Sequence, residues 1–171
     1  IFICSLGQSF AVHAAQAQYE TSEVEAQGFR KTQNIYDENR NTYTECKEEG
    51  VITIRNSEGI AGIYVEFDRI PTTWTLINPT TMESTTCGEY GFLHEFVAVN
   101  DLYEALPEEL VLQFPAGTVI ADVYAFTEGE LPDWVQVWEP PCETADLMLV
   151  TTHSDDEQLF FAGLLPMYAG E

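Results

Sequence analysis

Near its C-terminal end the chain carries a histidine and three adjacent carboxylates, directly after a run of apolar residues. The stretch reads DLMLVTTHSDDEQLFF and places His153 three residues before Asp156. An imidazole nitrogen and a carboxylate oxygen at this spacing can be directed at one point, and both are zinc ligands. Because a catalytic zinc ion usually takes three protein ligands and one water, these two residues predict an incomplete zinc site.

The same residues also have a purely structural interpretation. Ser154 and Glu157 match the capping box, in which the first residue caps a helix and the fourth reaches back to it. Asp155 and Asp156 would then lie in the first helical turn, where the helix dipole stabilises carboxylates. This interpretation does not explain His153. That histidine would lie at the C-terminal end of a buried strand, which is where open α/β sheets place their functional sites.

The stretch LMLVTTHSDDEQLFFAGLLPMYAGE resembles the opening of the PIG-L, or LmbE-like, family of zinc-dependent N-deacetylases. The hallmark of that family is a strand ending in His-Pro-Asp-Asp-Glu, followed by a helix. The resemblance implies that His153 and Asp156 are zinc ligands and that Asp155 is the general base. Ser154 replaces the family's proline, at a position that supplies no ligand. The family's third ligand is a histidine beyond Glu171, so the chain as given is expected to be inactive.

The elements around this motif predict two kinds of fold along the chain. Residues 51–129 contain short β-type runs such as VITIR, IAGIYVEF and TVIADVYAF, separated by turn-forming residues, which is typical of an antiparallel β-sandwich. The segment from Ser57 to Gly129 also resembles the discoidin or galactose-binding-like sandwiches of extracellular carbohydrate enzymes. The continuous apolar run and helical pattern of residues 145–171 predict the first strand and helix of a Rossmann-like α/β domain.

Residues 130–144 are predicted to be a linker between these two parts. Three prolines, Pro132, Pro140 and Pro141, prevent a strand or helix from continuing through this segment. Trp134 and Trp138 lie four residues apart within it. We interpret them as side chains that anchor the linker in an interdomain groove; a platform on which a sugar stacks is the alternative.

The N-terminal sequence predicts export. Residues 1–17, IFICSLGQSFAVHAAQA, contain no charged residue and end in Ala15-Gln16-Ala17, which is typical of a signal peptide remnant cleaved before Gln18. Residues 18–50 are polar and are predicted to be a mobile entry to the sandwich. The protein is therefore expected to be secreted. Export permits disulfides, and Cys46–Cys87 is the expected pair, with two buried thiols as the alternative.

The charge balance excludes two classes of partner. The 171 residues carry 29 Asp and Glu against six Lys and Arg, a net charge of −23. Such a protein repels phosphate backbones and anionic lipid headgroups, which argues against nucleic-acid and membrane-surface binding. No stretch after the signal remnant approaches the roughly 20 apolar residues of a membrane span.

Two functions remain from these observations. The first is the N-terminal part of a secreted zinc-dependent deacetylase that acts on an N-acetylglucosamine-type sugar or glycoconjugate. The second is a non-catalytic carbohydrate-binding β-sandwich whose acidic segment caps a helix. The identity of the sugar and the oligomeric state do not follow from the sequence.

Overall fold

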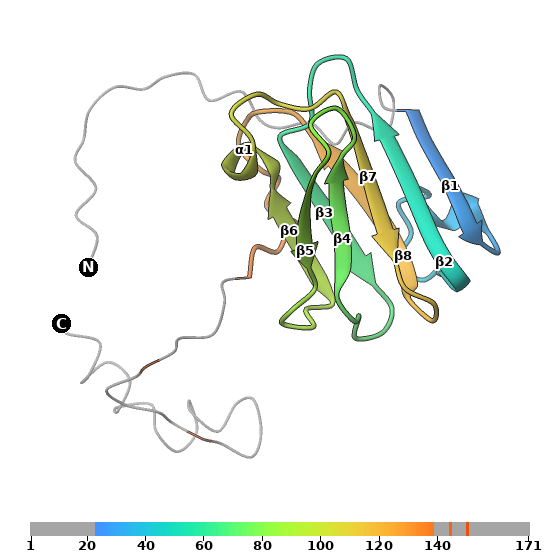
Figure 1. The fold of residues 1–171 in the computed structure, drawn as a ribbon. Helices are drawn as coiled ribbons and strands as arrows, with labels where there is room; N and C mark the ends of the chain where they lie inside the picture. Colours follow the sequence, from blue (N-terminus) through green and yellow to red (C-terminus); the bar gives the residue numbers. More distant parts are fainter. Residues whose placement is uncertain (1–22, 139–143, 145–149, 151–171) are drawn as a thin grey trace. The chain divides into compact units, whose positions relative to one another are not determined.

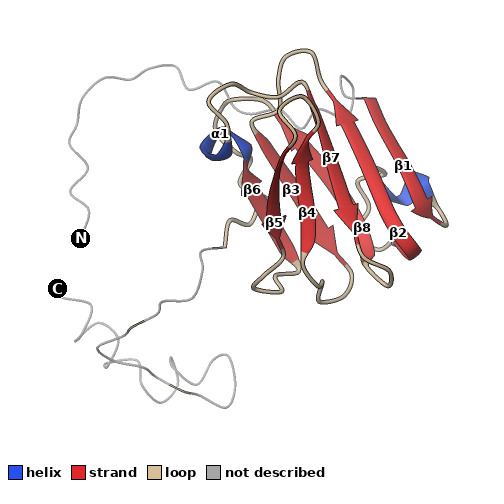
Figure 2. Cartoon of the chain, viewed as in Figure 1, coloured by secondary structure: helices blue, strands red, loops and turns tan. Residues whose placement is uncertain are grey.

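The computed structural model describes residues 23–138, together with Thr144 and Val150. Residues 23–138 form an antiparallel β-sandwich, as predicted (Figures 1 and 2). The strands, one short helix and one 3-10 turn are β1 (Glu23–Phe29), η1 (Thr32–Ile35), β2 (Thr44–Arg55), β3 (Gly62–Phe67), β4 (Trp74–Asn78), β5 (Glu83–Cys87), β6 (His94–Ala98), α1 (Val99–Leu102), β7 (Glu109–Phe114) and β8 (Val119–Phe126). The strand and helix predicted within residues 145–171 lie outside the described part.

The long strand β2 belongs to both sheets of the sandwich. Its second half pairs with β1 and β7, so that one sheet has the order β1-β2-β7-β4-β5. Its first residues, Thr44 and Glu45, pair with Ile120 and Val119 of β8, which gives the other sheet the order β2-β8-β3-β6. The sandwich therefore begins at β1, earlier than the predicted boundary at residue 51.

The main core lies between the two sheets and follows the alternation of the strands. In β7, Leu110, Leu112 and Phe114 are buried while their neighbours are partly exposed. The ring of Trp74 stacks on that of Phe114 with 5.2 Å between centroids. Each such side chain contributes on the order of 1.5–3 kcal/mol through removal of apolar area from water.

β3 and β8 differ from the other strands because they are buried on both faces. Residues 127–138, most of which we predicted to be linker, account for part of this by packing on the outer face of the β8-β3-β6 sheet. There Tyr64, Tyr124 and Phe126 form a second apolar cluster with Leu131 and Val135. This segment is therefore part of the sandwich.

Trp134 anchors this segment to the sheet. Its ring centroid lies 4.8 Å from that of Tyr124, and the backbone amide of Gln136 donates a hydrogen bond of 3.3 Å to the Tyr64 hydroxyl. Trp138 lies further along and contacts the ring of Phe92 at 5.9 Å. The anchoring interpretation is confirmed for Trp134, but its contacts lie on the outer face of the sandwich and not in an interdomain groove.

We expect Trp134→Ala to lower the free energy of unfolding by about 1–2 kcal/mol, because the variant loses half-buried ring area and the contact with Tyr124. The matched variant Trp138→Ala should change it by less than about 0.5 kcal/mol, since that side chain is 56% exposed. Urea unfolding measures both values. Equal losses in the two variants would contradict the anchoring role of Trp134.

The expected Cys46–Cys87 disulfide is wrong. Both thiols are free and buried, and their strands β2 and β5 are separated in the sheet by β7 and β4. Three strand spacings amount to about 14 Å, whereas bridged cysteines need Cα atoms within about 7 Å. Burial raises the pKa of Cys87 to about 12, so this thiol is expected to be unreactive.

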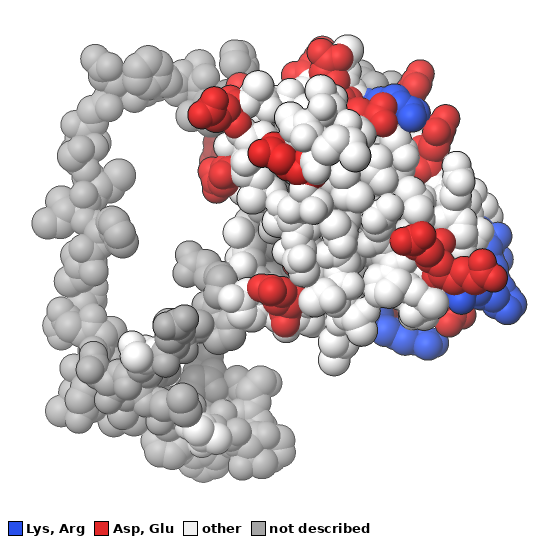
Figure 3. Space-filling model, in the orientation of Figure 1, with Lys and Arg blue, Asp and Glu red and all other residues white. Residues whose placement is uncertain are grey.

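Charge is unevenly distributed over the sandwich. On the face shown in Figure 3, the basic side chains lie on the side of β1 and β2, while the charged side chains near α1 are acidic. Arg55, the last residue of β2, forms ion pairs with Glu25 and Glu109. Among the described residues, no helix is long and apolar enough to cross a membrane.

Candidate functional site

The residues predicted to form a zinc site lie outside the described part of the chain. His153 and Asp156, the predicted ligands, and Asp155, the predicted base, can therefore not be placed, and their roles stay predictions. Within residues 23–138, no three His, Cys, Asp or Glu side chains are grouped so that they could hold a metal ion.

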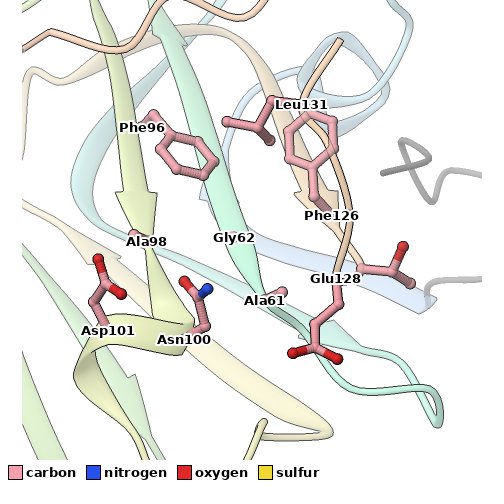
Figure 4. A pocket seen from close by; sticks show the side chains of 11 residues that line it. Ala61, Gly62, Phe96, Ala98, Asn100, Asp101, Phe126, Glu128 and Leu131 are labelled. Atoms are coloured by element: carbon pink, nitrogen blue, oxygen red, sulfur yellow. The ribbon is translucent and has the colours of Figure 1, made fainter. Parts of the chain in front are cut away.

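A cavity of about 310 Å³ opens on the outer face of the β8-β3-β6 sheet, beside α1 (Figure 4). Its volume lies at the lower end of the range of small-molecule pockets, which suits a compact ligand such as one sugar ring. Eleven residues line it, from the starts of β3 and α1 and the ends of β6 and β8: Ala61, Gly62, Phe96, Ala98, Asn100, Asp101, Phe126, Thr127, Glu128, Gly129 and Leu131.

Strand register builds the floor of this cavity. Gly62 pairs with Ala98 on one side and with Phe126 on the other, so two small residues lie side by side across β3 and β6. A Cβ atom on Gly62 would lie 2.7 Å from the Phe96 ring. Glycine lets the ring lie directly against the backbone here, and a larger residue would force the ring to shift.

One side of the cavity is apolar. Phe96 is half-buried and presents part of its ring, while Phe126, only 1% exposed, supports it from a centroid distance of 6.4 Å. Leu131, from the segment that crosses the sheet, lies on the same side in Figure 4. An aromatic ring exposed in this way offers a surface on which the apolar face of a ligand can pack.

The opposite side is polar. Asn100 and Asp101 come from α1, and Glu128 comes from the turn after β8 (Figure 4). The helix is fixed at the cavity because the backbone amides of Val99 and Asn100 both donate to the carbonyl of Ala61, at 2.9 and 3.1 Å. Within residues 23–138, the three polar side chains form no hydrogen bond or ion pair, so they are available to a ligand.

A row of buried charged groups lies further along the same face of the sheet. In the strand register Glu66 of β3 lies opposite His94 of β6 and Asp122 of β8, and the residues Glu66 and Asp122 are at most 1% exposed. Arg40 forms an ion pair of 2.8 Å with Glu66, and the His94 Nδ1 atom lies 3.6 Å from the same oxygen. The backbone amide of Glu38 donates to Asp122 at 3.2 Å.

Burial, together with the nearby charges of Asp37 and Glu66, raises the pKa of Asp122 to about 7, although the hydrogen bond from the Glu38 amide acts in the opposite direction. The loop that carries Arg40 and Glu38 covers this row. The row therefore links the loop to the sheet, and it lies away from the cavity.

Sequence reasoning missed both the cavity and the carboxylate row. One signal was present: a glycine inside the strand-like run IAGIYVEF often marks a close approach of another group to the backbone. The pairing of Gly62 with Ala98 and Phe126 depends on register between distant segments and has no local signal.

Comparison with known proteins identifies the fold of this chain but does not assign the chain to a family. No family model matches the chain, and no curated protein matches it. The protein CpGH89CBM32-6 produced by Clostridium perfringens is similar in structure, with a TM-score of 0.50 and 15% identity over 64% of this chain and 96% of that chain. A pectin-binding carbohydrate-binding module has a TM-score of 0.48 and 12% identity, over 69% of this chain and 96% of that chain. An F5/8 type C domain from Bacteroides fragilis has a TM-score of 0.45 and 11% identity, over 68% and 97%.

These comparisons confirm one resemblance and overturn the other. The likeness to the Clostridium perfringens structure shows a galactose-binding-like sandwich, as residues 57–129 predicted. The resemblance to the PIG-L family is wrong, because no family model matches the chain and the Clostridium perfringens structure that it resembles shares its β-sandwich fold. The assignment to that family rested on a short motif. Residues Ser154 to Glu157 also match the capping-box pattern, so the motif alone does not imply a catalytic role.

Proposed function

We propose that the sandwich is a non-catalytic carbohydrate-binding module and that a sugar ring binds in the cavity beside α1. The observation that carries this proposal is the two-sided lining, with the Phe96 ring facing Asn100, Asp101 and Glu128 across a floor of small residues. The likeness in fold to the Clostridium perfringens module supports it. We also propose that the protein acts outside the cell, on the evidence of the signal-like residues 1–17.

A pyranose ring has the two-sided chemistry that this lining matches. One face of the ring presents C–H groups, which pack on an aromatic side chain, and its rim carries hydroxyl groups that both donate and accept hydrogen bonds. Asn100 can donate and accept, whereas the carboxylates of Asp101 and Glu128 accept. The ring would therefore lie against Phe96 with its hydroxyls directed at α1 and at the turn after β8.

We expect Phe96→Ala to weaken sugar binding at least tenfold, because the packing surface is lost, and Asn100→Ala to weaken it about three- to tenfold. Isothermal titration calorimetry of residues 18–138, with a panel of mono- and oligosaccharides, measures both. The Asn100 side chain is exposed and has no partner within the described residues, and the variant keeps the backbone hydrogen bond to Ala61, so it should keep the unfolding temperature of the parent.

Tyr90→Ala is the matched control for this experiment. Tyr90 is 52% exposed and lies in the loop before β6, at the end of that strand remote from α1. Binding that survives Phe96→Ala and Asn100→Ala but is lost in Tyr90→Ala would place the sugar elsewhere and would refute this site.

A further inference from the structure

We infer that the ligand of the cavity is an amino sugar that carries a free, protonated amine. This inference rests on the proposed function and deepens it by naming the chemical class of the sugar. Three observations support it: the charges of the lining, the absence of a basic side chain among the described residues that line the cavity, and the position of Phe96.

The charged side chains that line the cavity are all acidic. Asp101 and Glu128 are its charged residues, and no Lys, Arg or His is among the described residues that line the cavity. The two carboxylates come from different elements and lie on opposite sides of Asn100 in Figure 4. A cation placed between them would be attracted by both, whereas a neutral hydroxyl would gain only hydrogen bonds.

Within the described part of the chain, no basic side chain neutralises these carboxylates. Neither forms an ion pair within residues 23–138, and Arg55, at the same end of the sandwich, is committed to Glu25 and Glu109. The net charge of −23 adds a long-range potential of the same sign. A uronic acid would therefore be repelled from this site, and a protonated amine would be drawn to it.

The aromatic side of the cavity favours the same ligand. Phe96 exposes part of its ring opposite the polar side, so an ammonium group on a sugar packed against that ring lies near an aromatic face. Cations are attracted to aromatic faces, and the attraction grows as water is excluded. An amino sugar would use the ring and the carboxylates together, which a simple polycation cannot do.

The test compares short oligomers of glucosamine, of N-acetylglucosamine and of galacturonic acid by calorimetry at pH 6 and 150 mM salt. We expect the glucosamine oligomer to bind at least tenfold more tightly than the acetylated one, and the galacturonate oligomer to bind least. Asp101→Asn and Glu128→Gln should each lower the affinity for glucosamine about three- to tenfold more than they lower the affinity for N-acetylglucosamine, because only the amine loses a charged partner.

Glu130→Gln is the matched control, because Glu130 is exposed and lies two residues from Glu128 but does not line the cavity. It should leave all affinities unchanged. An equal loss in Glu130→Gln, or glucosamine binding that persists in the Asp101→Asn, Glu128→Gln double variant, would mean general attraction to an acidic surface and would overturn the inference. Equal binding of the acetylated oligomer overturns it too, but leaves the proposed function intact. If Phe96→Ala changes none of the affinities, the proposed function itself fails.

Discussion

Asp122→Asn is expected to stabilise the protein at pH 8 and to remove much of the dependence of its stability on pH. The folded protein raises the pKa of this carboxyl from 3.8 to about 7. Between these two values the folded state holds a proton that the unfolded state has released, so the free energy of unfolding falls as the pH rises from about 4 to 7. Above pH 7 this loss is complete, and it amounts to at most about 4 kcal/mol.

An asparagine at this position removes the charge from the buried row and keeps its shape. Its amide can also donate to the neighbouring Glu66, whose Oε2 atom receives no hydrogen bond from the described residues. We therefore expect the variant to be about 1–3 kcal/mol more stable than the parent at pH 8 and nearly equal to it at pH 4.

Urea unfolding at a series of pH values measures this effect, and Asp133→Asn, which changes an exposed carboxylate, is the control. The difference between parent and variant isolates Asp122 from the other acids that titrate over the same range. A variant that is less stable than the parent at pH 8 would show that the folded protein requires the ionised carboxylate.

Gly62→Ala is expected to cost about 1–3 kcal/mol of folding free energy and to weaken sugar binding more than tenfold. The added methyl would lie 2.7 Å from one ring carbon of Phe96 and 2.8 Å from the next, so the ring must move into the cavity. Both effects have one cause, the displaced ring, and they should therefore be coupled.

A double-mutant cycle with Phe96→Leu tests this coupling. The smaller side chain leaves room for the methyl, so Gly62→Ala should cost less than about 0.5 kcal/mol in that background. Urea unfolding of the four proteins gives the coupling energy. If the cost of Gly62→Ala is the same in both backgrounds, the requirement for glycine comes from the backbone and not from the Phe96 ring.

The sandwich could be predicted from the sequence because its inner faces follow strict alternation. Ile63, Val65 and Phe67 point into the core of the structure, as their spacing indicated. β1 and the first half of β2 were missed for a physical reason. They alternate as well, with Thr44 and Cys46 buried, but their exposed faces are so highly charged that the segment reads as a polar tail.

The outer face of the β8-β3-β6 sheet could not be predicted. An outward position in an antiparallel strand normally faces water, which is where Glu66 and Asp122 would be expected. Residues 36–42 and 127–138 cover that face and make both carboxylates buried. The same packing, together with the pairing of Gly62, creates the cavity, and both depend on contacts between distant segments.

The position of β8 has a consequence for how the protein is made. β8 is the last strand of the sandwich in the sequence, yet it lies between β2 and β3 in the finished sheet. A growing chain that has not reached Phe126 therefore leaves the edges of both neighbours unpaired, and such edges invite aggregation. The sheet closes only when contacts across more than 70 residues form at once, which places the folding time in the millisecond-to-second range. The edges of β2 and β3 therefore stay exposed until synthesis has passed Phe126 and this folding step is complete.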